Sequence, residues 1–179
     1  MSTLVHFVHG KESGPWGSKF SHLASIARDQ GCAIESLDYA GIADPQARAD
    51  KLVAACADQV RPLILVGSSM GGWVATAASN QVKPLGLFLL APAFYLPAYP
   101  DVSPLCAPDN IEVIHGWRDE VIPYAHSVQF GRQQGCTVHL LDDDHRLGAR
   151  LDTIGGYFTL FLQRLLNGGE LQSASQEIP

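Results

Sequence analysis

The chain has 179 residues and a formal net charge of −6, with 46% hydrophobic and 17% charged residues. That length suits a single domain with a full hydrophobic core. The acidic balance leaves no basic stripe for nucleic acid, and the apolar runs are too short to span a membrane, so neither partner is expected.

The N-terminus and the cysteines indicate where the protein works. Residues 1–4 lead directly into an apolar run, without the basic stretch, long apolar region and small-residue cleavage site of a signal peptide. The four cysteines are widely spaced and form no C-x-x-C pair, so neither a disulfide framework nor a metal site is indicated. We therefore expect a cytoplasmic protein with reduced thiols.

Strand and helix signals alternate along the chain, which is typical of a parallel sheet covered on both faces. Strands are expected at residues 4–8, 34–37, 63–67, 86–90, 111–115 and 137–141. Helices are expected from Pro15 to Gly31, from Asp44 to Pro62 with Val60 on the apolar face, from the 67–72 segment to Pro84, from Pro123 to Gly135, and along a stripe from Leu151 to Leu165. Since no linker or repeat divides the chain, we predict one domain over residues 1–166 and a flexible tail over residues 167–179.

The most informative motif is Gly67-Ser68-Ser69-Met70-Gly71-Gly72, which joins a strand-like run to a helix-compatible one. A G-x-S-x-G at such a junction forms a nucleophile elbow, in which Ser69 lies on a strained turn with its hydroxyl exposed. Glycines at the two flanking positions let strand and helix approach closely. The backbone N–H of Met70 is then placed to stabilise an oxyanion. The competing interpretations are a helix cap at Ser69, or Ser68 as the reactive residue.

A serine nucleophile needs a base, and the base needs a group that orients it. His145 follows the last expected strand and Asp119 follows the fifth, so both lie at the carboxyl edge of the sheet, where open parallel sheets bind ligands. Other candidates for the acid are Glu120, Asp101 and Asp142. The remaining histidines form three pairs. His6 and His139 lie within strands and are expected to be structural, and His22 and His126 lie in helices as surface or packing residues. His9 and His115 end strands at the active edge and are expected to shape the site.

Together these motifs resemble those of small, lidless, esterase-like α/β-hydrolases. The matching residues are His9-Gly10, the 67–72 motif, Gly116…Asp119…Pro123 and Asp144-His145, and the resemblance extends from Leu4 to Leu166. It implies the α/β-hydrolase fold: a mostly parallel sheet of about six strands with helices on both faces. No lid domain is expected, because the segment from Leu90 to Ile111 is too short for one. In that family the residue after the first His-Gly supplies a second oxyanion N–H, and here that residue is Lys11.

The resemblance implies a serine hydrolase of the carboxylesterase or thioesterase type, acting on a small-molecule acyl substrate without a cofactor. Ser69 would be the nucleophile, His145 the base and Asp119 the orienting acid, with the N–H groups of Met70 and Lys11 as the oxyanion hole. Alternatives are a peptidase or acyltransferase with the same triad, and a non-catalytic hydrolase-like binding module. A metal-dependent hydrolase at the run Asp142-Asp143-Asp144-His145 comes third.

Overall fold

The protein is described by a computed structural model that covers residues 2–104 and 106–174. The strands are β1 (Leu4–Val8), β2 (Ala33–Ser36), β3 (Leu63–Ser68), β4 (Gly86–Leu90), β5 (Ile111–Gly116) and β6 (Thr137–Leu141). The helices are α1 (Ser18–Asp29), α2 (Pro45–Ala55), α3 (Met70–Val82), α4 (Tyr124–Gln134) and α5 (Leu151–Ala174), with a 3-10 turn, η1, at Pro108–Asn110. Strands and helices alternate as predicted, and most strand boundaries agree within a residue.

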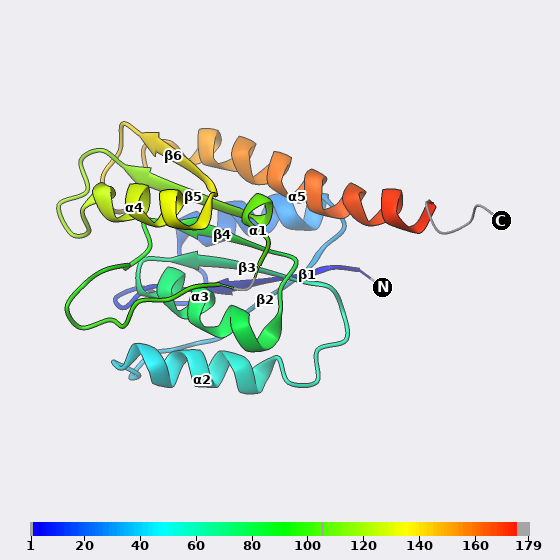
Figure 1. Ribbon diagram of the computed structural model, residues 1–179, viewed down its shortest axis with the longest axis horizontal. Helices are drawn as coiled ribbons and strands as arrows, with labels where there is room; N and C mark the ends of the chain where they lie inside the picture. The colour runs from blue at the N-terminus through cyan, green and yellow to red at the C-terminus, as the bar shows by residue number, and fades with distance from the viewer. Residues whose placement is uncertain (1, 105, 175–179) are drawn as a thin grey trace.

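The strands form one parallel six-stranded sheet in the order β2-β1-β3-β4-β5-β6 (Figure 1). The chain runs from β1 outward to β2, returns to β3 on the other side of β1, and then continues away from it. At such a reversal the loops that follow the two central strands open a crevice at the carboxyl edge of the sheet. β1 and β3 pair through Val8 and Gly67, so the segments that follow these two residues leave the sheet side by side.

Helices cover both faces of the sheet, with α1 packed on α5 and α2 packed on α3 (Figure 1). Alternate residues of β1 enter the two cores: Val5 and Phe7 lie with residues of α1 and α5, while Leu4 and Val8 lie with residues of α2 and α3. Because both faces are buried, the central strands are apolar along most of their length. Between β4 and β5, the described residues form only η1, so the predicted α/β-hydrolase fold without a lid domain is confirmed.

Two helix boundaries differ from the prediction. α1 begins at Ser18 rather than Pro15, which lies in the preceding loop with its carbonyl 3.2 Å from the Ser36 hydroxyl. α2 ends at Ala55, and Val60, predicted on its apolar face, is 76% exposed. After Ala55 the N–H groups of Ala57 and Gln59 bond to the carbonyls of Ala54 and Cys56, three residues back, so the chain continues in tight turns before it enters β3.

The last helix is longer than its apolar stripe, since α5 continues to Ala174 and projects beyond the sheet (Figure 1). The predicted flexibility of residues 167–179 stays a prediction, as does the domain boundary at residue 166, and residues 175–179 lie outside the described part.

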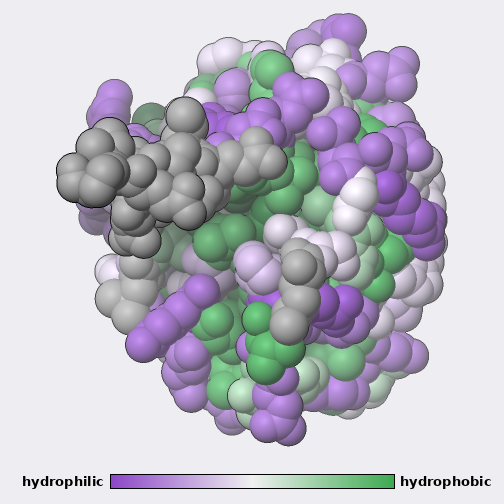
Figure 2. Space-filling view, turned by 90° about the vertical axis from the view of Figure 1, so that its right-hand side faces the viewer, coloured by the Kyte–Doolittle hydropathy of each residue, from purple (hydrophilic) through white to green (hydrophobic). Residues whose placement is uncertain are grey.

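The end of the molecule away from the carboxyl edge carries intermingled hydrophobic and hydrophilic residues (Figure 2). Over the described ranges, no helix has both the length and the apolar character needed to cross a bilayer.

Candidate active site

Ser69 occupies the sharp turn between β3 and α3, with φ 56° and ψ −122°. A non-glycine residue rarely adopts a positive φ, and it persists only where the surroundings enforce it. Here the backbone enforces it: the Ser69 N–H donates to the Leu90 carbonyl at 2.9 Å, and the Ser69 carbonyl accepts from Gly72 and Ala93 at 2.9 and 3.0 Å. The strain is therefore held by hydrogen bonds to the start of α3 and to the segment that follows β4.

The glycines of the motif allow this turn to form. A Cβ at Gly67 would lie 2.4 Å from the Gly71 carbonyl oxygen, and a Cβ at Gly71 would lie 1.8 Å from that of Val8. Both distances are far below van der Waals contact, so any side chain at either position would push strand and helix apart.

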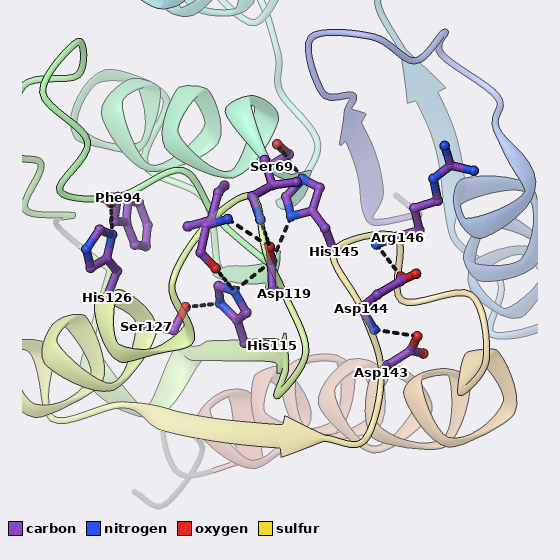
Figure 3. Close-up of polar contacts among 12 residues, drawn as sticks. Ser69, Phe94, His115, Asp119, His126, Ser127, Asp143, Asp144, His145 and Arg146 are labelled. Carbon is purple, nitrogen blue, oxygen red and sulfur yellow. Dashed lines mark hydrogen bonds and ion pairs between the residues drawn. The ribbon is translucent and has the colours of Figure 1, made fainter.

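Three loops bring Ser69, His145 and Asp119 into one hydrogen-bonded line (Figure 3). The Ser69 hydroxyl lies 3.1 Å from His145 Nε2, and His145 Nδ1 lies 2.7 Å from Asp119 Oδ2. A carboxylate only accepts hydrogen bonds, so Nδ1 carries the imidazole proton and Nε2 is free to accept from Ser69. This tautomer is the one that a general base for Ser69 requires.

Asp119 is buried and fully bonded. Its Oδ1 accepts from the backbone N–H groups of Val121 and Ile122 at 2.9 and 2.8 Å. Burial acts to raise the pKa of Asp119, but the hydrogen bonds from Ile122, His145 and Val121 outweigh it and hold this pKa below its usual value. The other acid candidates do not reach the imidazole: Glu120 and Asp101 are exposed, and Asp142 pairs with Arg118 and Arg150.

The acidic run before His145 shapes the loop that carries it. The buried Asp143 accepts at Oδ2 from the N–H groups of Ala149 and Arg150 at 2.9 and 3.0 Å, just before α5 begins. Asp144 accepts from the Arg146 N–H at 2.8 Å. These carboxylates are thus bonded to backbone N–H groups, and the described ranges contain no group of three or more side chains suited to hold a metal ion.

A second histidine, His115, contacts the Asp119 carboxylate, and sequence analysis did not predict this contact. His115 Nε2 lies 2.9 Å from Asp119 Oδ2 and 3.0 Å from the Ile122 carbonyl oxygen, and its Nδ1 lies 2.7 Å from the Ser127 hydroxyl (Figure 3). Burial lowers the pKa of His115, and Asp119 opposes that effect only in part. The sequence placed His115 at the correct edge, but the only signal for this contact was the four-residue spacing from Asp119. Ser127, within α4, carried no signal.

On the other side of Ser69, the loop after β1 is held by buried polar contacts. His9 Nε2 accepts from the Tyr39 N–H at 3.0 Å, so its Nδ1 carries a proton and donates to the Gly10 carbonyl at 2.8 Å. Arg48 Nη1 donates to the same carbonyl at 3.1 Å. The carbonyl and N–H of one trans peptide point in opposite directions. The N–H of Lys11 is therefore directed away from His9 and Arg48.

Arg48 is another site residue that sequence reasoning missed. Its side chain is buried on α2, and its Nε donates to the Ile42 carbonyl at 2.7 Å. An arginine within a helix gives no local sign of whether it faces solvent or a loop, so nothing in the sequence pointed to these contacts.

The site opens into a cavity of about 970 Å³ that includes Ser69, Met70 and Lys11 in its wall. The lining is mixed in character. Its apolar side chains include Met70, Ala93, Leu96, Tyr99 and Ile122, and its polar residues include Lys11, Ser13, Lys19, Glu120, Asp144 and Arg146. Lys19 donates to the Arg146 carbonyl at 3.0 Å, next to His145, and burial lowers its pKa to about 8.

A six-stranded parallel sheet with a strained serine after β3 and no lid defines a lidless hydrolase of the α/β class. A sequence model of the alpha/beta hydrolase family matches residues 7–168. The chain therefore belongs to the alpha/beta hydrolase family, and hydrolysis is the class of reaction that this membership supports.

Solved structures agree with this assignment. A hydrolase-superfamily protein of the α/β class from Xanthomonas campestris is 30% identical, with a TM-score of 0.82 over 91% of this chain and 99% of that one. A lidless α/β serine hydrolase from the same species is 20% identical, with a TM-score of 0.79 over 90% and 81%. Alpha/beta hydrolase domain-containing protein 10 from mouse is 20% identical, with a TM-score of 0.74 over 90% of each chain. The last two likenesses concern the fold alone. No curated protein sequence matches the chain significantly.

Proposed function

We propose that the protein is a serine hydrolase that cleaves a small carboxylic ester or thioester through an acyl-enzyme intermediate. The observation that carries this proposal is the line of hydrogen bonds from Ser69 through His145 to the buried Asp119. A serine hydroxyl is a weak nucleophile on its own and needs an oriented base within hydrogen-bond reach.

In the proposed reaction, Ser69 attacks the acyl carbonyl while His145 Nε2 accepts the hydroxyl proton. His145 then gives that proton to the leaving group, and the acyl group stays on Ser69. Water attacks the acyl-enzyme with His145 again as the base, which releases the acid and restores the serine. Asp119 stays ionised throughout and stabilises the imidazolium, in keeping with its lowered pKa.

We assign the oxyanion hole to the backbone N–H groups of Met70 and Lys11. Met70 is the first residue of α3, so its N–H has no partner within the helix, and the positive end of the helix dipole adds to its effect. For Lys11 the support is indirect: His9 and Arg48 hold the carbonyl of the same peptide on the opposite side. Loss of one oxyanion donor costs on the order of a hundredfold or more in kcat.

The cavity supports a small acyl substrate with a polar leaving group. An acyl chain would lie against apolar lining residues such as Leu96 and Tyr99, and a polar leaving group would contact polar ones such as Lys11 and Arg146. We further propose that the protein works in the cytoplasm, since Cys32, Cys56, Cys106 and Cys136 are all free thiols.

The decisive experiment is fluorophosphonate labelling with peptide mapping on wild type, Ser69→Ala and His145→Ala. The proposal requires covalent labelling of Ser69 in wild type and its loss in both variants. A screen of short acyl esters, thioesters and amides then separates an esterase from a peptidase. If folded wild-type protein is not labelled, the serine hydrolase proposal is wrong and the alternative of a non-catalytic binding module is favoured.

A further inference from the structure

A chain of hydrogen bonds continues behind the proposed triad. It runs from the Ser127 hydroxyl to His115, from His115 to Asp119 Oδ2, and from there to His145 and Ser69 (Figure 3). His115 and Ser127 are fully buried, so no solvent competes for these contacts.

The direction of each bond follows from its acceptors. His115 Nε2 faces two groups that can only accept, the Asp119 carboxylate and the Ile122 carbonyl, so it must carry a proton. Burial lowers the pKa of His115, which favours a neutral ring with a bare Nδ1. Nδ1 then accepts from the Ser127 hydroxyl, and this bond selects the tautomer.

The two histidines meet at one oxygen. Asp119 Oδ2 accepts from His145 at 2.7 Å and from His115 at 2.9 Å, while its other oxygen is held by two backbone N–H groups. With both oxygens held, the carboxylate cannot rotate away from His145. Each hydrogen bond that a carboxylate accepts also reduces the negative charge that it presents to its other partners.

We propose that His115, held in one tautomer by Ser127, is a positioning residue that fixes the Asp119 carboxylate toward His145 and moderates its negative charge. This inference rests on the proposed serine hydrolase function. His115 does not touch the substrate and passes on no proton, because its Nε2–H stays shared between Asp119 and the Ile122 carbonyl. The titratable groups that act on His115 are Asp119 and His145.

The test uses the rate at which a fluorophosphonate probe labels Ser69, measured between about pH 5 and 9, since this needs no knowledge of the natural substrate. His115→Leu removes the donor at similar volume. His115→Gln restores a neutral N–H donor. Ser127→Ala removes the group that selects the tautomer. Ser79→Ala is the matched control, because Ser79 is also a fully buried helix serine and donates only to the Thr76 carbonyl.

We expect His115→Leu to slow labelling about tenfold or more. Its acid limb should move up by about one pH unit, because an unmoderated Asp119 keeps the base protonated to higher pH. Ser127→Ala should shift the profile in the same direction by less, and His115→Gln should recover part of the wild-type rate. The downfield proton resonance of the His145–Asp119 hydrogen bond should move in His115→Leu and Ser127→Ala but not in Ser79→Ala.

Each negative outcome has one meaning. If wild type labels and the folded His115→Leu and Ser127→Ala variants match Ser79→Ala in rate and pH profile, His115 is only a core residue and this inference is wrong. If His115→Leu does not fold, Ser127→Ala decides by the same comparison. If folded wild type is not labelled at Ser69 at any pH, the proposed triad is wrong and this inference is overturned with it.

Discussion

A Cβ atom placed on Gly71 would lie 1.8 Å from the Val8 carbonyl oxygen, so the first turn of α3 rests directly on the end of β1. The helix that follows Ser69 and the strand before the loop of Lys11 are thus in close backbone contact. Of the two proposed oxyanion donors, Met70 begins this helix and Lys11 lies in the loop that follows this strand, so the contact joins the two segments that precede and carry them.

Gly71→Ala should therefore disrupt both stability and the site. The obstructing atoms belong to the backbone of Val8 and His9 and cannot rotate away, so we expect a loss of about 3 kcal/mol or more in the free energy of unfolding. Denaturant unfolding measures this loss. The control is Gly156→Ala on α5, where an added Cβ meets nothing within 4 Å and helix propensity predicts a gain of about 0.5–1 kcal/mol. Equal stability of the two variants would contradict the packing described at the elbow.

Asp119→Asn should lower kcat/KM by about 10⁴ while the protein stays folded. An amide oxygen can still accept from Val121 and Ile122, but its NH₂ group would then face His145 Nδ1 and favour the wrong tautomer. Steady-state kinetics on an active acyl ester provide the measurement. Asp101→Asn is the matched control: it changes another exposed carboxylate that the sequence offered as the acid and should leave the rate within about twofold.

Arg48→Met should destabilise the protein by about 2–4 kcal/mol, because the Ile42 and Gly10 carbonyls lose a buried charged donor. It should also lower kcat more than it raises KM, since the Gly10–Lys11 peptide loses one of its two restraints. Thermal unfolding and kinetics test the two effects separately. Arg61→Met removes an exposed ion pair with Glu35 and should cost less than about 1 kcal/mol. An Arg48→Met enzyme with unchanged kcat would show that the guanidinium serves stability alone.

His6 should make stability depend on pH. Burial lowers the pKa of His6 from 6.5 to about 4, with only partial opposition from Glu35, and both ring nitrogens are buried without a hydrogen-bond partner. Between these two pKa values the unfolded chain binds a proton that the folded protein does not. The contribution of neutral His6 to the free energy of unfolding is therefore fully present above about pH 6.5, and about 3 kcal/mol of it is lost as the pH drops toward 4.

His6→Leu should flatten this decline, because leucine fills the site and takes up no proton in either state. Denaturant unfolding of wild type and variant at about pH 7 and about pH 5 measures the difference in slope. The remaining decline should come from other histidines whose pKa is lowered by burial, His9, His115 and His139. If the two proteins lose stability equally, His6 is charged or solvated in the folded state.

Local sequence was sufficient to predict the strands and to place Ser69, Asp119 and His145 at one edge of the sheet. Apolar runs marked the strands within about a residue, and the glycines around Ser69 marked the elbow, because pleat, periodicity and turn chemistry are properties of neighbouring residues. The chain order of Ser69, Asp119 and His145 placed all three at the carboxyl edge, since a parallel sheet brings those strand ends together. Helix ends were less predictable: Val60 continued the apolar pattern of α2, yet the helix ends at Ala55.

By itself, then, the sequence determined the class of protein, the alternation of strands and helices, and the loops that carry the proposed catalytic residues. Only the tertiary structure decided which further side chains meet: His115 and Ser127 behind Asp119, and Arg48 beneath the loop of Lys11. The physical reason is that each of these contacts depends on side-chain direction, burial and the pairing of strands. These properties are set by the packing of the whole chain and produce no periodic pattern in the sequence.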